Sequence, residues 1–464
     1  MTGSPSTSPD ANPPTLPLPI PAGGRAVGRL TVPPSKSVTH RFLNLALLAG
    51  SRPGASPLLV ERPLYAEDTR LFLAALGRAG FRVEESPEAV RLTPGPPPPE
   101  HREKEAEIEI FCGNAGTMLR FLVATLAVVP GRWRLDGTPR LRERPVGPLV
   151  EAVRRLGGQI EYLGRPGCVP LRIAGGSLRG GVTAIDAGES SQYLSALLMA
   201  GLAAPEGVVV EVGALTSQPY IEVTLAAAAA FGGRIERLGE HAFRVRPAGP
   251  AGVGASRVRV EGDWSAACYP AAAAALTGGD VRLAGVFPDS RQGDRHFLDL
   301  LTAMGAAVAW EGDLLAVRGR EGGDLQGIDA DLSGLPDQVP TLAALGPFAR
   351  GTTRITNVPH LRIKESDRLG AMASELGRVG AAVEEGADNL TVHGLWHRET
   401  GASPPSGRVV IDSHNDHRIA MSMALVGLRR PGIEIAAPEV VGKSYPEFWA
   451  DLTSLLQGPV SGSG

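Results

Sequence analysis

Four lysines stand out among the cationic residues of this chain, because Lys and Arg together number 46 and the other 42 are arginines. A lysine ammonium is a compact point charge, whereas the arginine guanidinium is planar and wider. A lysine kept against such an arginine bias indicates a position that needs the smaller cation, although chance survival on the surface is the alternative. Lys36, Lys364 and Lys443 lie in polar motifs, whereas Lys104 lies in a charged run that we interpret as solvated surface.

Cations and hydroxyls gather at one predicted helix start, Ser35 to Arg41. Lys36 and Arg41 oppose the partial positive charge of a helix N-terminus, so a bound anion is the simplest explanation for both. A second cationic segment, PRLRERP at 139–145, includes an acidic residue that can neutralise part of its charge. We expect one ligand-binding arginine in this segment rather than three.

Three later motifs combine cations with other polar groups. KESDR at 364–368 is either part of a ligand site or an ordinary salt-bridged helix start. NDHR at 415–418 opens an apolar helix with an arginine, which needs a polar partner at that depth. GKSYP at 442–446 again places a lysine just before a predicted helix.

An internal repeat must position these motifs. Its signature is an apolar helix end, then Gly, which favours a left-handed helix cap, and then an alternating segment typical of a strand. Successive copies lie 72 to about 80 residues apart. They occur at Leu76-Gly77, Leu156-Gly157, Phe231-Gly232, Met304-Gly305 and Leu376-Gly377, with a degenerate copy at Leu456 to Gly458.

Six polar loops interleave with this signature, and each opens into an apolar helix. They span 33–37, 113–117, 188–192, 262–266, 335–340 and 414–418. Together the two series predict a βαβαββ unit of about 75 residues that occurs six times, three times in each of two domains. Helix N-termini from both domains would then face one cleft and could bind phosphate or carboxylate. Ordinary capping explains any single loop, but six such loops favour ligand binding.

Length and composition agree with a two-domain globular protein. The 464 residues exceed the roughly 250 to 300 at which one core stops growing, and no apolar run is long enough to span a membrane. The net charge of −3 argues against a nucleic-acid partner. Residues 1–24, rich in Pro, Ser and Thr, are predicted to form a disordered tail. Three cysteines without a CxxC motif predict a reducing compartment and no structural metal.

The motifs, taken in order, resemble those of the 5-enolpyruvylshikimate-3-phosphate synthase family. They are PPSKSVTHR, GNAGT, PRLRERPVG, SSQY, SQPY, LPDQVP, IKESDRL, NDHR and GKSYPEF, and the resemblance runs from about residue 25 to the C-terminus. It implies an α/β (α+β) fold, a two-domain inside-out α/β barrel of six βαβαββ repeats. One domain would span 35–258, the other 25–34 plus 259–464, with the active site in the cleft between them.

The resemblance implies two adjacent substrate subsites. The shikimate 3-phosphate subsite would contain Lys36, Ser37, Arg41, Ser190, Ser191, Gln192, Ser217, Tyr220, Asp337 and Lys364. The phosphoenolpyruvate subsite would contain Lys36, Gly116, Arg140, Gln192, Arg368, Arg418 and Lys443. Arginines suit planar carboxylate and phosphate oxygens, and lysines suit the points where two anions crowd together.

The implied reaction moves the enolpyruvyl group of phosphoenolpyruvate to the 5-hydroxyl of shikimate 3-phosphate and releases phosphate, by addition and then elimination. Carbon 3 must gain and later lose a proton while the hydroxyl loses one, and two carboxylates in different environments suit that alternation. By resemblance, Asp337 is the candidate at the hydroxyl and Glu365 the candidate at carbon 3, with Lys36 as the third catalytic candidate. Which proton each one moves stays open at this point.

The same resemblance sets further expectations about cofactors and partners. No metal and no organic cofactor is expected, and no nucleic acid or membrane partner. We expect a cytoplasmic monomer of the shikimate pathway, which leads to chorismate and the aromatic amino acids. Gly116 leaves room beside the phosphoenolpyruvate subsite, so glyphosate is expected to compete there.

Two departures from the family pattern bear on the site. The first loop reads Pro-Pro-Ser-Lys-Ser where Pro-Gly-Ser-Lys-Ser is usual, which changes backbone freedom but not the cation. His360 stands where an Asn often contacts the shikimate substrate, so it is left outside the expected site. The loop at 262–266 receives no ligand role from the resemblance and is expected to be structural.

Three other functions compete with this interpretation. The sister enzyme that acts on UDP-N-acetylglucosamine pairs its early lysine with Asn and carries a reactive loop cysteine, whereas this chain has Lys36-Ser37, and Cys112 is better explained as a buried small hydrophobe. A non-catalytic anion-binding protein on the same scaffold predicts loss of Asp337 or Glu365, and both are present. An RNA-end cyclase needs a basic surface, which the net charge does not support.

Overall fold

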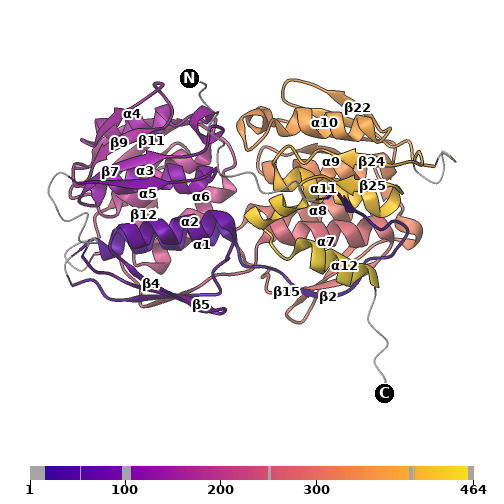
Figure 1. The fold of residues 1–464 in the computed structure, drawn as a ribbon, viewed down its shortest axis with the longest axis horizontal. Helices are drawn as coiled ribbons and strands as arrows, with labels where there is room; N and C mark the ends of the chain where they lie inside the picture. Colours follow the sequence, from indigo (N-terminus) through magenta and orange to yellow (C-terminus); the bar gives the residue numbers. More distant parts are fainter. Residues whose placement is uncertain are drawn as a thin grey trace, which may run out of the picture.

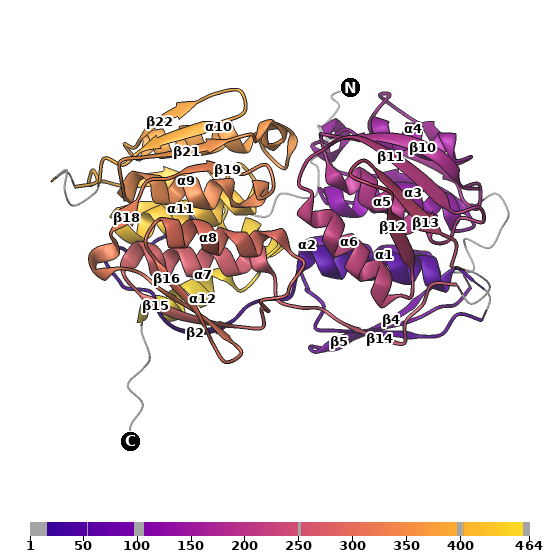
Figure 2. The same ribbon diagram turned by 180° about the vertical axis from the view of Figure 1, so that it is seen from behind.

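The protein forms two lobes that lie side by side (Figures 1 and 2). The computed structural model describes residues 16–52, 54–96, 106–248, 252–396, 401 and 403–457. One hydrophobic core contains buried residues from Val38 to Val260, and the other contains residues from Ile20 to Val32 and from Trp264 to Leu455. The chain therefore passes between the lobes twice, between Val32 and Val38 and again between Val260 and Trp264. The predicted surface residue Lys104 lies outside the described residues.

The first lobe contains three four-stranded sheets with one pattern, a parallel pair followed by two antiparallel strands. The first, in the order β14-β3-β5-β4, comprises β3 (Leu58–Glu61), β4 (Arg82–Glu85), β5 (Ala89–Thr93) and β14 (Arg257–Arg259). The second, β6-β7-β9-β8, comprises β6 (Glu107–Phe111), β7 (Arg132–Asp136), β8 (Gln159–Tyr162) and β9 (Leu171–Ala174). The third, β10-β11-β13-β12, comprises β10 (Gly181–Ala187), β11 (Val208–Leu215), β12 (Arg234–Arg237) and β13 (Ala242–Arg246).

The second lobe repeats this pattern in two sheets and shortens it in a third. The sheet β16-β17-β15-β2 comprises β2 (Val27–Thr31), β15 (Asp280–Ala284), β16 (Ala307–Glu311) and β17 (Leu314–Arg318). The sheet β19-β21-β23-β22 comprises β19 (Asp329–Asp331), β21 (Thr352–Thr356), β22 (Ala382–Glu385) and β23 (Leu390–His393). The third comprises β1 (Leu18–Pro19), β24 (Val409–Ile411) and β25 (Ile433–Ile435), and a separate parallel pair joins β18 (Leu325–Gln326) to β20 (Ala349–Arg350).

Three helices in each lobe are buried almost along their whole length and pack against one another. In the first lobe these are α1 (Lys36–Gly50), α3 (Gly116–Val128) and α5 (Ser191–Gly201), and in the second α7 (Trp264–Thr277), α9 (Val339–Leu345) and α11 (His417–Arg429). The other helices are α2 (Glu67–Arg78), α4 (Gly147–Arg155), α6 (Pro219–Ala230), α8 (Phe297–Ala303), α10 (Arg368–Arg378) and α12 (Phe448–Gln457). Each of the six predicted polar loops precedes one of the six buried helices. No helix in the described ranges is both long and apolar enough to cross a membrane.

Short 3-10 helices occupy several loops at the ends of the strands. They are η2 (Leu141–Glu143), η3 (Gly293–His296), η4 (Glu321–Gly323), η5 (Pro336–Gln338), η6 (Gly346–Phe348), η7 (Pro359–Ile363) and η9 (Pro438–Lys443). Four of them, η2, η5, η7 and η9, carry or adjoin predicted site residues.

The two segments of the chain that cross between the lobes are hydrogen-bonded to each other. The amide of Ser35 donates to the carbonyl of Glu261 at 2.8 Å, and the amide of Asp263 donates to the carbonyl of Pro33 at 2.8 Å. The Asp263 carboxylate accepts from the amide of Lys36 at 2.9 Å and from the amide of Ala266 at 3.1 Å. One carboxylate thus caps the first turns of α1 and α7, which belong to different lobes, and fixes the two helix starts beside each other.

The prediction that residues 1–24 form a disordered tail is wrong from Leu18 onward. Leu18 and Pro19 pair with β25, and the amide of Ile20 donates to the carbonyl of Ile433 at 2.9 Å. Ile20 is buried in the second core. This segment therefore supplies the antiparallel strand of the shortened sheet, while residues 1–15 lie outside the described part of the chain.

Candidate active site

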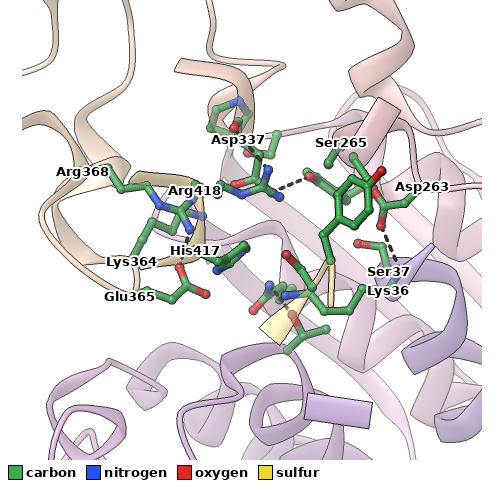
Figure 3. Close-up of a pocket in the computed structure, with 18 of the residues that line it drawn as sticks. Lys36, Ser37, Asp263, Ser265, Asp337, Lys364, Glu365, Arg368, His417 and Arg418 are labelled. Carbon is green, nitrogen blue, oxygen red and sulfur yellow. Dashed lines mark hydrogen bonds and ion pairs between the residues drawn. The ribbon is translucent and has the colours of Figure 1, made fainter. Parts of the chain in front are cut away.

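A pocket between the lobes collects most of the residues predicted from the motifs (Figure 3). The first lobe contributes Lys36, Ser37, Arg41, Thr117, Arg144, Ser190, Ser191, Gln192, Ser217 and Tyr220 to its lining. The second contributes Asp263, Ser265, Ala266, Tyr269, Pro336, Asp337, Lys364, Glu365, Arg368, His417, Arg418, Met421, Ser444 and Tyr445. Of the predicted site residues, only Gly116, Arg140 and Lys443 are absent from this lining.

Asp337 lies at the centre of a dense hydrogen-bond network. Arg418 donates to its carboxylate at 2.7 Å, Arg368 at 2.9 Å and the Tyr220 hydroxyl at 2.9 Å. Burial by itself would raise the pKa of Asp337, but the charges of Arg418 and Arg368 outweigh burial and hold that pKa below its ordinary value. The two guanidinium charges therefore favour the ionised carboxylate.

Glu365 is surrounded by cations on the other side of the same guanidinium. Arg368 Nη2 donates to Glu365 Oε2 at 2.7 Å, and Figure 3 shows the two side chains directed toward each other. Lys443 Nζ and Arg144 Nη1 each lie 3.9 Å from Glu365 Oε1. Burial would raise the pKa of Glu365, but the charges of Arg368, Lys443 and Arg144 together hold it well below its ordinary value.

Arg368 binds the carboxylates of Asp337 and Glu365 and also a third, buried carboxylate. Its Nε donates at 2.7 Å to Asp416, whose side chain is 0% exposed. Asp416 also caps α11 through the amide of Arg418 at 3.0 Å. The buried arginine predicted to need a polar partner, Arg418, finds that partner in Asp337. The motifs at 335–340, 364–368 and 414–418 thus meet in one ion-pair network.

Arg41 is a buried cation whose hydrogen-bond partners are neutral. Its guanidinium donates to the Thr224 hydroxyl at 2.8 Å and to the carbonyls of Ser37 at 2.9 Å and Tyr220 at 3.0 Å. Burial lowers the pKa of Arg41 to about 10. Among the described residues, no carboxylate forms an ion pair with Arg41. A charge buried in this way favours an anionic ligand.

Two more cations, Lys36 and Lys364, line the same pocket. Lys36 Nζ is 3.6 Å from the buried carboxylate of Asp68. Burial lowers the pKa of Lys364 to about 8, with the charge of Arg368 lowering it further and that of Asp337 opposing the shift. Ser190 accepts from the amide of Gln192 at the start of α5, so the hydroxyls in this part of the pocket sit at a helix N-terminus.

The cationic segment at 139–145 places a different arginine in the pocket from the one expected. Arg144 lines the pocket and its side chain is 4% exposed. Arg140 instead donates to the carbonyls of Lys364 at 3.1 Å and Glu365 at 3.2 Å, and Arg142 pairs with Asp136 at the surface. Among the three arginines of this segment, Arg144 is the one that lines the pocket.

Gly116 and Lys443 lie directly behind the lining. Gly116 begins α3, and a Cβ atom placed on it would lie 2.5 Å from Arg144 Nη2. Lys443 is nearly buried and donates to the carbonyl of Asn114 at 3.3 Å, in addition to its approach to Glu365. Gly116 thus limits the position of Arg144, and Lys443 contacts Glu365 without lining the pocket itself.

Several lining residues were not predicted from the motifs. The Thr117 hydroxyl accepts from the side-chain amide of Gln192 at 2.9 Å, and His417 lies beside the ion-pair network. The loop at 262–266, expected to be only structural, contributes Asp263 and Ser265 to the lining. Its position as one of six equivalent loops was the available signal. His360 is buried outside the lining, and burial lowers its pKa to about 4.

Comparison with known proteins agrees with the motifs. The family EPSP synthase (3-phosphoshikimate 1-carboxyvinyltransferase) matches residues 20–452. A 3-phosphoshikimate 1-carboxyvinyltransferase of Syntrophobacter fumaroxidans is 44% identical over 92% of this chain and 96% of its own length. A protein of the same name from Methanoculleus marisnigri is 43% identical over 90% of this chain and 94% of its own length.

Solved structures similar to this chain are also EPSP synthases. An EPSP synthase from Acinetobacter baumannii superimposes with a TM-score of 0.74 at 28% sequence identity, over 94% of this chain and 97% of that one. Family match, relatives and fold agree over almost the whole chain. The chain belongs to the EPSP synthase family.

Proposed function

We propose that this protein transfers the enolpyruvyl group of phosphoenolpyruvate to the 5-hydroxyl of shikimate 3-phosphate and releases inorganic phosphate. The observation that carries the proposal is the pair of carboxylates, Asp337 and Glu365, held on opposite sides of the Arg368 guanidinium in a pocket rich in cations. Two carboxylates can serve two proton transfers, and the cations can bind two anionic substrates. Family membership supports the same reaction.

We assign shikimate 3-phosphate to the part of the pocket near the crossing segments. Its ligands there are Lys36, Ser37, Arg41, Ser190, Ser191, Gln192, Ser217, Tyr220, Asp337 and Lys364. The buried Arg41, with neutral partners, and Lys364 supply positive charge for its phosphate and carboxylate. Tyr220 and Asp337 are hydrogen-bonded to each other and would share the substrate hydroxyls.

We assign phosphoenolpyruvate to the part of the pocket around Glu365. Its ligands there are Lys36, Gln192, Arg368, Arg418 and Lys443, with Gly116 leaving space for it. Arg144 takes the place first expected for Arg140, because its guanidinium lines the pocket. Bidentate guanidinium contacts match the planar oxygens of a carboxylate or phosphate.

The cations proposed to bind the substrates also hold the two carboxylates. Substrate anions would draw Arg418 and Arg368 away from Asp337, so its pKa would rise toward the range of an effective base. In the same way, substrate anions would draw Lys443 and Arg144 away from Glu365, so the pKa of Glu365 would rise and it could take up a proton. Substrate binding thus prepares both groups for proton transfer.

The protons then balance over the whole reaction. Asp337 removes the proton of the 5-hydroxyl as its oxygen attacks carbon 2, and Glu365 adds a proton to carbon 3. Glu365 takes that proton back as the carbon–oxygen bond to phosphate breaks, and the proton on Asp337 leaves with the phosphate. Lys36, between the two subsites, stabilises the negative charge on the intermediate.

We infer that the fold is an inside-out α/β barrel of six βαβαββ units, three in each domain. The recurring sheet pattern and the six buried helices support this. The proposed domains are 35–258 and 25–34 plus 259–464, and the division of hydrophobic residues between two cores supports boundaries near these positions. Anion binding would draw together cations that lie on both lobes.

We further propose that the protein works as a cytoplasmic monomer without a metal or organic cofactor. The three cysteines, Cys112, Cys168 and Cys268, are buried and free, which suits a reducing compartment. Burial raises the pKa of Cys112 above its ordinary value, so this thiol is poorly suited to act as a nucleophile.

Phosphate release with two alternative acceptors tests the function. We expect release from phosphoenolpyruvate in the presence of shikimate 3-phosphate, and none with UDP-N-acetylglucosamine. Mass spectrometry of the product should show the added enolpyruvyl group. Turnover with UDP-N-acetylglucosamine and none with shikimate 3-phosphate would contradict the proposal.

A further inference from the structure

Arg140 connects the two lobes through the backbone of Lys364 and Glu365, whose side chains line the pocket. From the first lobe, its Nη2 donates to the carbonyl of Lys364 at 3.1 Å and its Nε to the carbonyl of Glu365 at 3.2 Å. Its remaining nitrogen, Nη1, pairs with Glu143 at 2.8 Å. All three nitrogens of the guanidinium are therefore engaged, two of them by consecutive backbone carbonyls of the second lobe.

The segment that receives these bonds carries two side chains of the pocket. Lys364 follows the short helix η7 with an extended backbone, and α10 begins only at Arg368. The intervening residues form no strand pairing, so the carbonyls of Lys364 and Glu365 are bound from outside by Arg140. These carbonyls belong to the peptide planes on either side of Glu365, so the two bonds fix the direction of the Glu365 side chain and restrain the C-terminal side of Lys364.

The surroundings of Glu365 show how this segment is held from both sides. On the side of the second lobe, the Ser366 hydroxyl donates to Asp416 at 3.0 Å. On the side of the first lobe, Arg140 binds the backbone while Arg144 approaches the Glu365 side chain at 3.9 Å. Two arginines of one loop thus have separate tasks, one directed at the peptide groups and one at the pocket.

We propose that Arg140 is a positioning residue that holds the Lys364–Glu365 backbone across the cleft and does not itself contact phosphoenolpyruvate. This inference rests on the proposed function, because it assigns how the lysine and the carboxylate of that site are oriented. Its effect reaches shikimate 3-phosphate through Lys364 and proton transfer through Glu365. A direct ligand of phosphoenolpyruvate would affect neither the binary complex with shikimate 3-phosphate nor the backbone of 364–365.

The variant Arg140→Gln tests the proposal, and the separate variant Arg142→Gln is its matched control. Arg142 belongs to the same loop but pairs with Asp136 within its own lobe. We expect Arg140→Gln to weaken binding of shikimate 3-phosphate alone roughly tenfold, the effect of losing two hydrogen bonds, and to lower kcat as well. Arg142→Gln should behave as wild type. Calorimetry measures the binary affinity, and steady-state kinetics separates kcat from the two KM values.

A different result with Arg140→Gln would overturn the proposal. If Arg140→Gln leaves the binary affinity and kcat unchanged and raises only the KM for phosphoenolpyruvate, Arg140 is a ligand and the proposal is overturned. Arg140→Lys keeps the charge but can reach the two carbonyls with only a single donor atom. We expect it to recover only part of the lost affinity, whereas full recovery would show that charge alone is needed.

Hydrogen exchange gives a readout that needs no turnover. In the free protein and in excess inorganic phosphate, amides in the segment 364–368 should exchange faster in Arg140→Gln than in wild type or Arg142→Gln. Equal exchange in all three proteins would contradict the positioning role. A wild-type protein that shows this protection but releases no phosphate from its substrates would contradict the proposed reaction and leave the role of Arg140 standing.

Discussion

Arg144 packs so closely against Gly116 that the position of its guanidinium requires residue 116 to have no side chain. A Cβ atom on Gly116 would lie 2.5 to 2.6 Å from three atoms of the Arg144 guanidinium, far inside van der Waals contact. Gly116 has a helical backbone without a positive φ, so the constraint is the space itself rather than the backbone conformation.

Gly116→Ala is expected to displace the Arg144 guanidinium into the pocket. Because Arg144 is the proposed partner of phosphoenolpyruvate, the KM for this substrate should rise by about tenfold while shikimate 3-phosphate binds almost as before. Inhibition by glyphosate, expected at the same subsite, should weaken in parallel. Steady-state kinetics with each substrate varied in turn measures these effects. An unchanged KM and unchanged inhibition would show that Arg144 is not at that subsite.

Lys443→Arg is expected to impair use of phosphoenolpyruvate by well over tenfold in kcat/KM, more than about 1.4 kcal/mol. The Lys443 side chain is 7% exposed between Asn114 and Glu365, where a wider guanidinium does not fit without moving one of them. Urea denaturation should show whether the variant is folded. Kinetics close to wild type would remove the argument from lysine scarcity.

Asp337→Asn is expected to lower kcat by roughly 10² to 10⁴, the usual contribution of a general base. The amide keeps the shape of the side chain but cannot accept the hydroxyl proton. Asp329→Asn is the control, because Asp329 is a surface residue that pairs with Arg354 at 3.2 Å, and surface pairs contribute little. A loss confined to KM would show that Asp337 binds substrate without taking its proton.

Binding of shikimate 3-phosphate is expected to draw in a proton above pH 8. In the free protein, burial lowers the pKa of Lys364 to about 8, so much of the amine is neutral at pH 8.5. An anionic ligand favours the charged ammonium and raises that pKa, so a proton is taken up on binding and the affinity falls as pH rises through 8. The phosphate itself is already fully ionised, with a second pKa of about 6.

Calorimetry in two buffers with different ionisation enthalpies measures this uptake. We expect a fraction of a proton per ligand at pH 8.5 and much less at pH 7, where Lys364 is already charged. Lys364→Gln should abolish the difference between the two pH values. Equal uptake by wild type and variant would assign the proton to another group.

Asp263 is expected to contribute to stability through two helices at once. Asp263→Asn leaves one carbonyl oxygen for two amides and should lower the free energy of unfolding by about 1 kcal/mol, and Asp263→Ala by about 2 kcal/mol. Urea denaturation of the pair of variants measures the difference. An Asn variant as stable as wild type, beside a destabilised Ala variant, would show that only one of the two caps matters.

The motifs and the helix starts were predictable from the sequence because their signals are local. A polar loop that opens an apolar helix is visible in a few consecutive residues, and the scarcity of lysine singled out Lys36, Lys364 and Lys443. All three lie in or directly against the pocket. Their chemistry follows from residue type and from position at a helix N-terminus, whatever the rest of the chain does.

Tertiary structure alone decided which residues of those motifs face the pocket and which hold it together. Arg140 and Arg144 are four residues apart with the same chemistry, and only the approach of the second lobe directs one to backbone carbonyls and the other to the pocket. Leu18 and Pro19 pair with a strand more than 400 residues away, so no local pattern could mark them as ordered. Asp263 caps a helix of each lobe for the same reason. Such contacts depend on the packing of distant segments, whereas residue type and spacing report only what lies nearby.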